Sequence, residues 1–106
     1  MVSRGDVWLA VLDPTVGSEI QKTRPCLIIS PPEIHDHLRT VIVAPMTTGS
    51  RPAGFRVPIS FQGVAGLILL EQSRALDKRR LIKKLGEALS SDLTRALQTL
   101  REMYTE

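Results

Sequence analysis

Residues 13–25 read Asp-Pro-Thr-Val-Gly-Ser-Glu-Ile-Gln-Lys-Thr-Arg-Pro and join two apolar runs, 7–12 and 26–29, that both have the character of β-strands. A hairpin connection usually has about 2–5 residues, so a connection this long is typical of a functional or a disordered loop. The loop carries Glu19, Lys22 and Arg24, a carboxylate and two cations that can converge on a phosphate. The alternative is an ordinary polar loop in which Arg24 merely flanks a strand.

The apolar runs around this loop predict a small sheet. The first run places Trp8, Ala10 and Leu12 on one face and further apolar residues on the other, so it is expected to be a central strand. Pro58 lacks a backbone donor and places the strand that contains it at an edge. Five strands are expected, over residues 7–12, 26–30, 40–44, 55–59 and 66–70.

The C-terminal part predicts one helix. Ser90 or Ser91 can cap its N-terminus, and Asp92 in the first turn suits the helix dipole. An apolar face at helical spacing follows, made of Leu93, Ala96, Leu97, Leu100 and Tyr104. Residues 77–84 are expected to form a short helical or irregular segment. Five strands and one terminal helix predict an α+β, mostly β fold, a small twisted barrel of the SH3 kind.

The size and composition narrow the class of protein. A length of 106 residues predicts a single domain over residues 1–106. Neither a run of about 18 apolar residues nor a signal-peptide pattern is present, so we expect a cytoplasmic protein without a membrane span. Cys26 is the only cysteine and opens an apolar run, so it is expected to be a buried thiol and not a nucleophile.

The charge favours an acidic partner. The net charge is +3 with a pI of about 9.5, and residues 74–84 contain six basic side chains and one acidic side chain. Contact with nucleic acid and an ordinary solvated basic face both explain this cluster. Four aromatic residues are too few for a module that stacks several bases on one sheet.

Two further groups of polar residues follow predicted strands. Thr47 and Thr48 come just after Pro45, where their hydroxyls can donate to a phosphate oxygen or simply close a turn. At the polar end of the fifth strand lie Glu71, Gln72 and Arg74, which either line a cleft or begin a loop. His35 and His37 lack a third ligand at a recognisable spacing, so we expect no metal site and no cofactor.

Taken together, several short motifs resemble the MazF/PemK toxin family. They are Arg4-Gly5-Asp6-Val7-Trp8, Asp13-Pro14-Thr15, Gly17-Ser18-Glu19, Arg24-Pro25, Pro45-Met46-Thr47-Thr48, Gly54-Phe55, and Leu70-Glu71-Gln72 with Arg74, Leu76 and Asp77. Each piece alone is a weak signal, and the joint match is specific. The resemblance runs from residue 4 to about residue 80.

The resemblance implies a fold, an activity and partners. The fold would be a five-stranded SH3-like barrel of the PemK/CcdB type that forms a homodimer. The activity would be sequence-specific, metal-independent cleavage of single-stranded RNA, often mRNA, by the toxin of a type II toxin–antitoxin pair. A cognate antitoxin would lay an acidic segment across the basic cleft, and DNA would be contacted only through that antitoxin.

The resemblance also implies roles for individual residues. Arg24 and Thr47 match the catalytic arginine and threonine, and Glu19 is the candidate base for the 2′-hydroxyl of the RNA. The expected products are a 2′,3′-cyclic phosphate and a 5′-hydroxyl. The residues expected to bind RNA are Ser18, Lys22, Thr48, Phe55, Glu71, Gln72 and Arg74.

Some departures place the chain closer to the MazF branch. Ser18 and Leu69 stand where some PemK-type members carry a histidine and an arginine, and Glu71 stands where the acid would be. Two rival functions are a gyrase-poisoning toxin of the same fold and an RNA-binding barrel without catalysis. The gyrase poisons end in Trp-Gly-Ile, whereas this chain ends in Tyr104-Thr105-Glu106, and the combination of Glu19, Arg24 and Thr47 argues against loss of catalysis.

Overall fold

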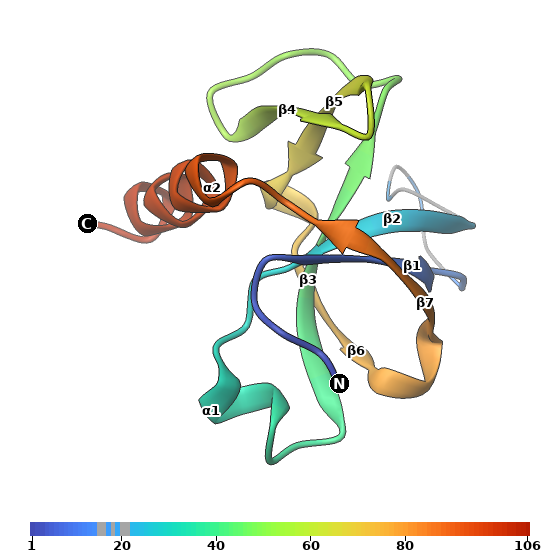
Figure 1. Ribbon diagram of the computed structural model, residues 1–106. Helices are drawn as coiled ribbons and strands as arrows, with labels where there is room; N and C mark the ends of the chain where they lie inside the picture. The colour runs from blue at the N-terminus through green and yellow to red at the C-terminus, as the bar shows by residue number, and fades with distance from the viewer. Residues whose placement is uncertain (15–16, 18, 20–21) are drawn as a thin grey trace.

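The chain folds into a curled antiparallel sheet with a helix at its C-terminal end, as a computed structural model shows (Figure 1). The structure describes residues 1–14, 17, 19 and 22–106. In chain order the elements are β1 (Asp6–Val11), β2 (Thr23–Ile28), α1 (Pro32–His35), β3 (Thr40–Thr47), β4 (Arg56–Phe61), β5 (Val64–Leu69), the 3-10 turn η1 (Leu70–Gln72), β6 (Arg74–Asp77), the 3-10 turn η2 (Lys78–Arg80), β7 (Leu81–Glu87) and α2 (Ser90–Met103).

Strand β3 organises the sheet. Within the described residues the order is β4-β5-β3-β2-β1-β7, and β6 also pairs with β3. Val43 lies between Ile28 of β2 and Arg74 of β6, whereas Met46 and Thr47 pair with β5. The edge of β3 that faces away from β2 therefore has two successive partners, β6 and then β5.

The strand positions confirm two expectations. β1 is central, because it pairs with β2 on one side and with β7 on the other. β4, which contains Pro58, is at an edge of the sheet and pairs only with β5 among the described strands.

Apolar side chains gather in two clusters because alternate residues of the same strands point to opposite faces. The first cluster is buried between the sheet, the β4–β5 hairpin and α2, and includes Val7, Leu27, Ala44, Met46, Val57, Ile59, Ile68 and Ala96. The second includes Ala10, Leu12, Cys26, Ile28, Val41, Val43 and Leu76, with Trp8 and Leu81 packed against it. Both faces of β1 and β2 are therefore covered.

Helix α2 begins where the sequence places it and differs in detail. Its N-cap is Leu89, without a capping side-chain hydrogen bond, so the expected serine cap is wrong. Asp92 lies in the first turn and accepts a hydrogen bond from Arg95 at 2.6 Å. Ala96 is buried, whereas Tyr104 follows the helix and is 79% exposed, so its expected place on the apolar face is wrong. Neither helix in the described part of the chain has the length and apolar character that a membrane crossing requires.

The expected mostly β fold with a terminal helix is confirmed, and the structure adds two strands, β6 and β7. Segment 77–84, expected to be helical or irregular, contains η2 and the start of β7. β7 is an edge strand with exposed Ile82, Lys83 and Lys84, and lysines are common on edges that must resist further pairing. Two shifts in its register with β1 disturb the alternation by which a strand is recognised in sequence.

A buried carboxylate joins β1 to β7. Asp6 is 1% exposed, and its Oδ2 accepts hydrogen bonds from the Ser3 backbone N–H at 2.8 Å and from Trp8 Nε1 at 3.2 Å. Its Oδ1 lies 3.3 Å from Lys84 Nζ on β7. A buried carboxylate with three partners is stabilising only while all of them are present, because each would otherwise be left without a partner.

Replacing this carboxylate tests its role in the fold. Asp6→Ala should lower the free energy of unfolding by about 2–3 kcal/mol, because the Ser3 N–H and the Trp8 indole lose their buried acceptor and Lys84 loses its ion pair. Urea denaturation followed by circular dichroism measures the loss.

The matched control is Glu87→Ala. The Glu87 carboxylate also approaches Lys84 Nζ, at 3.7 Å, but its side chain is 72% exposed. Its removal should change the free energy of unfolding by less than about 0.5 kcal/mol. Equal losses in the two variants would contradict a special role for the buried carboxylate.

Candidate active site

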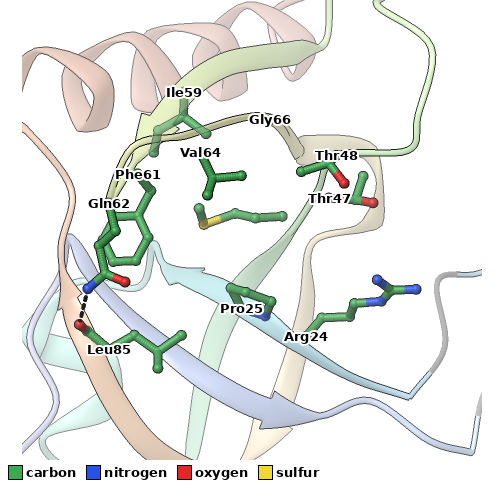
Figure 2. A pocket seen from close by; sticks show the side chains of 11 residues that line it. Arg24, Pro25, Thr47, Thr48, Ile59, Phe61, Gln62, Val64, Gly66 and Leu85 are labelled. Carbon is green, nitrogen blue, oxygen red and sulfur yellow. Dashed lines mark hydrogen bonds between the residues drawn. The ribbon is translucent and has the colours of Figure 1, made fainter.

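A pocket of about 310 Å³ lies between the start of β2, the end of β3 and the β4–β5 hairpin (Figure 2). It is lined by Arg24, Pro25, Met46, Thr47, Thr48, Ile59, Phe61, Gln62, Val64, Gly66 and Leu85. Two residues that the sequence nominates for catalysis, Arg24 and Thr47, thus line the same pocket.

The pairing of β2 with β3 explains why these two residues meet. In this pairing Cys26 lies opposite Pro45, and the strands are antiparallel. Arg24 lies two residues before Cys26 on β2 and Thr47 two residues after Pro45 on β3, so both are at the same end of the two strands. Both side chains line the same pocket there and can approach one small group.

The pocket has a polar end and an apolar end. Figure 2 shows the Arg24 guanidinium and the hydroxyls of Thr47 and Thr48 on one side of the pocket, and the side chains of Phe61 and Leu85 on the other. Thr47 Oγ1 accepts a hydrogen bond from the Gly49 backbone N–H at 3.2 Å. This bond fixes the oxygen and leaves the hydroxyl hydrogen able to donate to an anion. The polar end therefore has the chemistry of a phosphate site.

Gly66 of β5 sets the position of Thr47. A Cβ at residue 66 would lie 2.8 Å from the Thr47 carbonyl oxygen and 3.7 Å from Thr48 Cγ2. Real Cβ atoms do not approach backbone this closely, so only glycine lets β5 lie against the end of β3 as it does here. The packing of the β5 backbone against the end of β3 thus fixes the positions of the two threonines and their hydroxyls.

A second pocket, of about 330 Å³, holds other nominated residues. It is lined by Leu12, Glu19, Pro45, Glu71, Gln72, Ser73 and Arg74. Arg74 is held there by donating to the Leu12 carbonyl oxygen at 3.1 Å. The structure therefore separates Glu19 from the pocket of Arg24 and Thr47 and groups it with Glu71, Gln72 and Arg74. Pro45 lines the second pocket, and Met46, the next residue of β3, lines the first.

Other nominated residues have structural partners or lie elsewhere. Glu71 Oε2 accepts two hydrogen bonds from Arg56, at 2.9 and 2.6 Å, which fasten the start of β4 to η1. Phe55 is 41% exposed and lies under the Arg56 guanidinium, 5.7 Å from ring centroid to Cζ, and it lines neither of the two pockets. Its contact with RNA stays a prediction.

Of the long loop, only part can be described. Ser18 lies outside the described residues. Lys22 is exposed and has a φ of 69°, and its backbone N–H donates to Asp13 Oδ1 at 3.0 Å. The Leu12 N–H in turn donates to the Lys22 carbonyl at 2.9 Å, which closes the base of the loop. The Lys22 ammonium is left in solvent, where it can attract RNA in general.

The basic cluster at 74–84 serves largely to join segments. Arg80 donates to the backbone carbonyls of Val11 and Asp13, and Lys78 donates to the carbonyl of His35. Arg79 donates hydrogen bonds to the Asp77 carboxylate, and these hold the pKa of that carboxyl below its ordinary value. Several of these cations thus have structural partners, Arg79 is largely exposed to solvent, and contact of the cluster with nucleic acid stays a prediction.

The Cys26 thiol is buried, as the sequence predicts, and His35 has a structural partner. Cys26 is fully buried, and burial raises the pKa of its thiol to about 12, against an opposing effect of the Arg74 charge. Such a thiol is a poor nucleophile. His35 is buried, with Nδ1 2.9 Å from Ser30 Oγ. Among residues 1–14, 17, 19 and 22–106, no group of three His, Cys, Asp or Glu side chains is placed to hold a metal ion.

The apolar end of the pocket was missed by sequence reasoning. Leu85 belongs to β7, which the sequence did not reveal, and Gln62 with Gly63 was visible only as a turn. A polar residue at the tip of a hairpin carries no local signal that it faces a strand more than twenty residues away. Only the curl of the sheet brings Gln62 to Leu85.

Comparison with known proteins identifies the class. A family profile described as PemK-like, MazF-like toxin of type II toxin–antitoxin system matches residues 3–104. Because this match spans nearly the whole chain, the chain belongs to that family. The resemblance noted in the sequence motifs is thereby confirmed.

Individual relatives fit this placement. Endoribonuclease PemK of Escherichia coli is 32% identical over 108 residues, which cover 93% of this chain and 81% of PemK. Endoribonuclease MazF of Staphylococcus epidermidis is 41% identical over 91 residues, which cover 80% of this chain and 76% of that protein.

Solved structures share the fold. MazF of Deinococcus radiodurans superposes with a TM-score of 0.85 at 26% identity, and the match covers 96% of this chain and 94% of that chain. A MazE–MazF complex from the same organism matches with a TM-score of 0.71 at 26% identity, and covers 96% of this chain and 94% of that one.

The packing of Gly66 against Thr47 makes a prediction about the site. Gly66→Ala should lower the free energy of unfolding by about 1–3 kcal/mol, because a methyl group is forced against backbone. It should also displace the threonine hydroxyls and lower RNA cleavage, by up to about 100-fold for a shift near 1 Å. Thermal unfolding and the cleavage rate measure the two effects.

Gly54→Ala is the matched control. A Cβ at Gly54 would meet open space among the described residues, so both the stability and the cleavage rate should stay near those of the unaltered protein. If Gly66→Ala behaves like Gly54→Ala, the close approach of β5 does not position Thr47.

Proposed function

We propose that this toxin is a sequence-specific, metal-independent endoribonuclease that cleaves single-stranded RNA, mRNA in particular, in the pocket of Arg24 and Thr47. The observation that carries the proposal is that this pocket joins a guanidinium and two hydroxyls at one end to an apolar wall at the other. The curated relatives PemK and MazF, which are named endoribonucleases, support the activity. Cleavage of mRNA would inhibit translation and growth.

The chemistry follows from the charges that develop during cleavage. The ribose 2′-hydroxyl loses its proton, its oxygen forms a bond to the adjacent phosphorus, and the bond from phosphorus to O5′ breaks. A proton goes to the departing O5′, which leaves a 2′,3′-cyclic phosphate and a 5′-hydroxyl. Negative charge grows on the two non-bridging oxygens, where fixed donors stabilise it most.

Arg24 and Thr47 are the donors that we assign to those oxygens. The guanidinium stays charged at every relevant pH and can hold a phosphate with two parallel hydrogen bonds. The Thr47 hydroxyl adds a third donor from the facing strand. Because a guanidinium is a poor proton donor, Arg24 acts by electrostatic stabilisation and not as the general acid.

Glu19 remains the proposed base. It is exposed and lines the second pocket, next to Pro45. Glu19→Gln keeps the size of the side chain and removes its basicity. The variant therefore distinguishes between two roles of Glu19, as the general base or as a residue that only contacts RNA.

The partners that we propose are single-stranded RNA, an antitoxin and a second copy of the chain. The MazE–MazF complex of Deinococcus radiodurans supports the antitoxin. The net charge of +3 suits an acidic antitoxin segment that folds on binding, and DNA would be reached through that antitoxin. Exposed apolar side chains such as Leu89 and Ile82 leave surface for a homodimer. We place the protein in the cytoplasm, where its substrate is found.

Arg24→Ala tests the proposed function. The purified variant should cleave mixed RNA about 10²–10³ times more slowly than the unaltered protein, because one charged donor to the developing oxyanion is lost. The assay contains EDTA, and sequencing of the 5′-hydroxyl ends maps the cuts. Arg101→Ala, which removes an exposed arginine of α2 far from the pocket, should cleave at the normal rate.

Two results would contradict the proposal in different ways. A folded Arg24→Ala protein that cuts at the normal rate would remove Arg24 from the chemistry. Failure of the unaltered protein to cut any RNA would favour an RNA-binding barrel without catalysis.

A further inference from the structure

We propose that the apolar end of the pocket binds one nucleobase next to the cleaved phosphate, and that Gln62 reads the edge of that base. The inference rests on the proposed function and adds a determinant of sequence specificity to it. It starts from residues of the β4–β5 hairpin and β7 that the cleavage chemistry does not use.

The apolar end has the surface that a base requires. Phe61 supplies an aromatic face, and Leu85 and Val64 lie beside it (Figure 2). Val64 is 57% exposed, although it is an aliphatic side chain at a pocket wall. Stacking of a base on an aromatic side chain is favourable for every base, and an apolar neighbour at the rim is covered in the same step.

The aromatic ring is held in place by β7. A Cβ at Gly86 would lie 3.1 Å from Phe61 Cζ and 3.4 Å from Phe61 Cε1. The ring therefore lies directly over the backbone of Gly86, which makes room for it. A ring packed in this way loses little freedom when a base stacks on it, so binding is not weakened by ordering.

The side-chain amide of Gln62 has a nitrogen that is held by β7 and an oxygen that faces the pocket. Its Nε2 donates to the Leu85 carbonyl oxygen at 2.8 Å. Because a carbonyl oxygen only accepts, this contact requires the amide nitrogen there and turns Oε1 to the pocket side, as Figure 2 shows. The side chain thus presents an acceptor that can select a base by an N–H group on its edge.

The turn that carries Gln62 keeps it there. Gln62 and Gly63 have φ angles of 51° and 81°, the left-handed pair of a tight hairpin turn. The side chain therefore starts from a defined backbone and ends on a hydrogen bond to another strand. Because the backbone of Gln62 and its amide nitrogen are both held in place, the acceptor Oε1 has a defined position relative to the ring of Phe61.

The pocket itself indicates a nucleotide as its occupant. The phosphate donors Arg24 and Thr47 and the apolar end belong to one continuous pocket of about 310 Å³. A nucleotide has the same arrangement, with an anionic group linked by a short sugar to a flat apolar ring. An apolar side chain of a protein partner would fill one end and leave the guanidinium without an anion.

Gln62→Ala tests the inference through the sequence of the cut sites. The variant should still cleave RNA, and sequencing of the 5′-hydroxyl ends should show that base preference falls about 3–10-fold at one of the two positions that flank the cut, as expected for the loss of one hydrogen bond. The matched control is Gln98→Ala on the exposed face of α2, which should leave the preference unchanged.

Phe61→Leu provides a second and independent test of the base subsite. It keeps an apolar side chain and removes the stacking surface, so KM for a short RNA that contains the cut site should rise about tenfold while kcat changes little. Circular dichroism confirms that each variant is folded before its RNA is sequenced.

The outcomes separate this inference from the proposed function. If Gln62→Ala cuts the same sequences with the same preference, the base subsite is wrong, whereas the assignment of Arg24 stands. If Gln62→Ala or Phe61→Leu changes only self-association or antitoxin affinity, the apolar end belongs to a protein interface and the inference is overturned.

Discussion

The structure depends on the way in which β3 changes partners along one edge. Its first half pairs with β6 and its last two residues pair with β5, while β2 follows its other edge. Pro45 lies between the two partners on that edge, where the missing backbone N–H is tolerated. The change lets the β4–β5 hairpin turn away from the rest of the sheet, which curls (Figure 1). The pocket of Arg24 and Thr47 lies beside the end of β3.

The site is a consequence of this curl. The β2–β3 pairing brings Arg24 and Thr47 to the same end of the two strands, and the glycine at 66 lets β5 pack against Thr47. The hairpin then reaches β7 through Gln62, which completes the apolar end of the pocket. Electrostatic and apolar surfaces that lie far apart in the sequence are thus joined in one pocket, which suits a substrate that is charged at one end and flat at the other.

The sequence predicts the parts of this arrangement that have local signals. Apolar runs reveal β1 to β5, Pro58 marks an edge strand, and the motif around Thr47 identifies the polar end of the pocket. The two remaining strands lack such signals, because β6 is four residues long and β7 is an irregular, lysine-bearing edge. The placement of Glu19 with Glu71, away from Arg24, depends on the path of the chain in space, which residue types alone do not encode.

The central claim is that Arg24 and Thr47 act on the same phosphate, and a double-mutant cycle tests it most directly. Cleavage rates of Arg24→Ala, Thr47→Ala and the double variant are measured on one RNA under single-turnover conditions. We predict that the double variant loses much less activity than the product of the two single losses, because each removal disables a stabilisation that the other residue shares. Losses that multiply fully would show that the two residues act independently and would contradict the account.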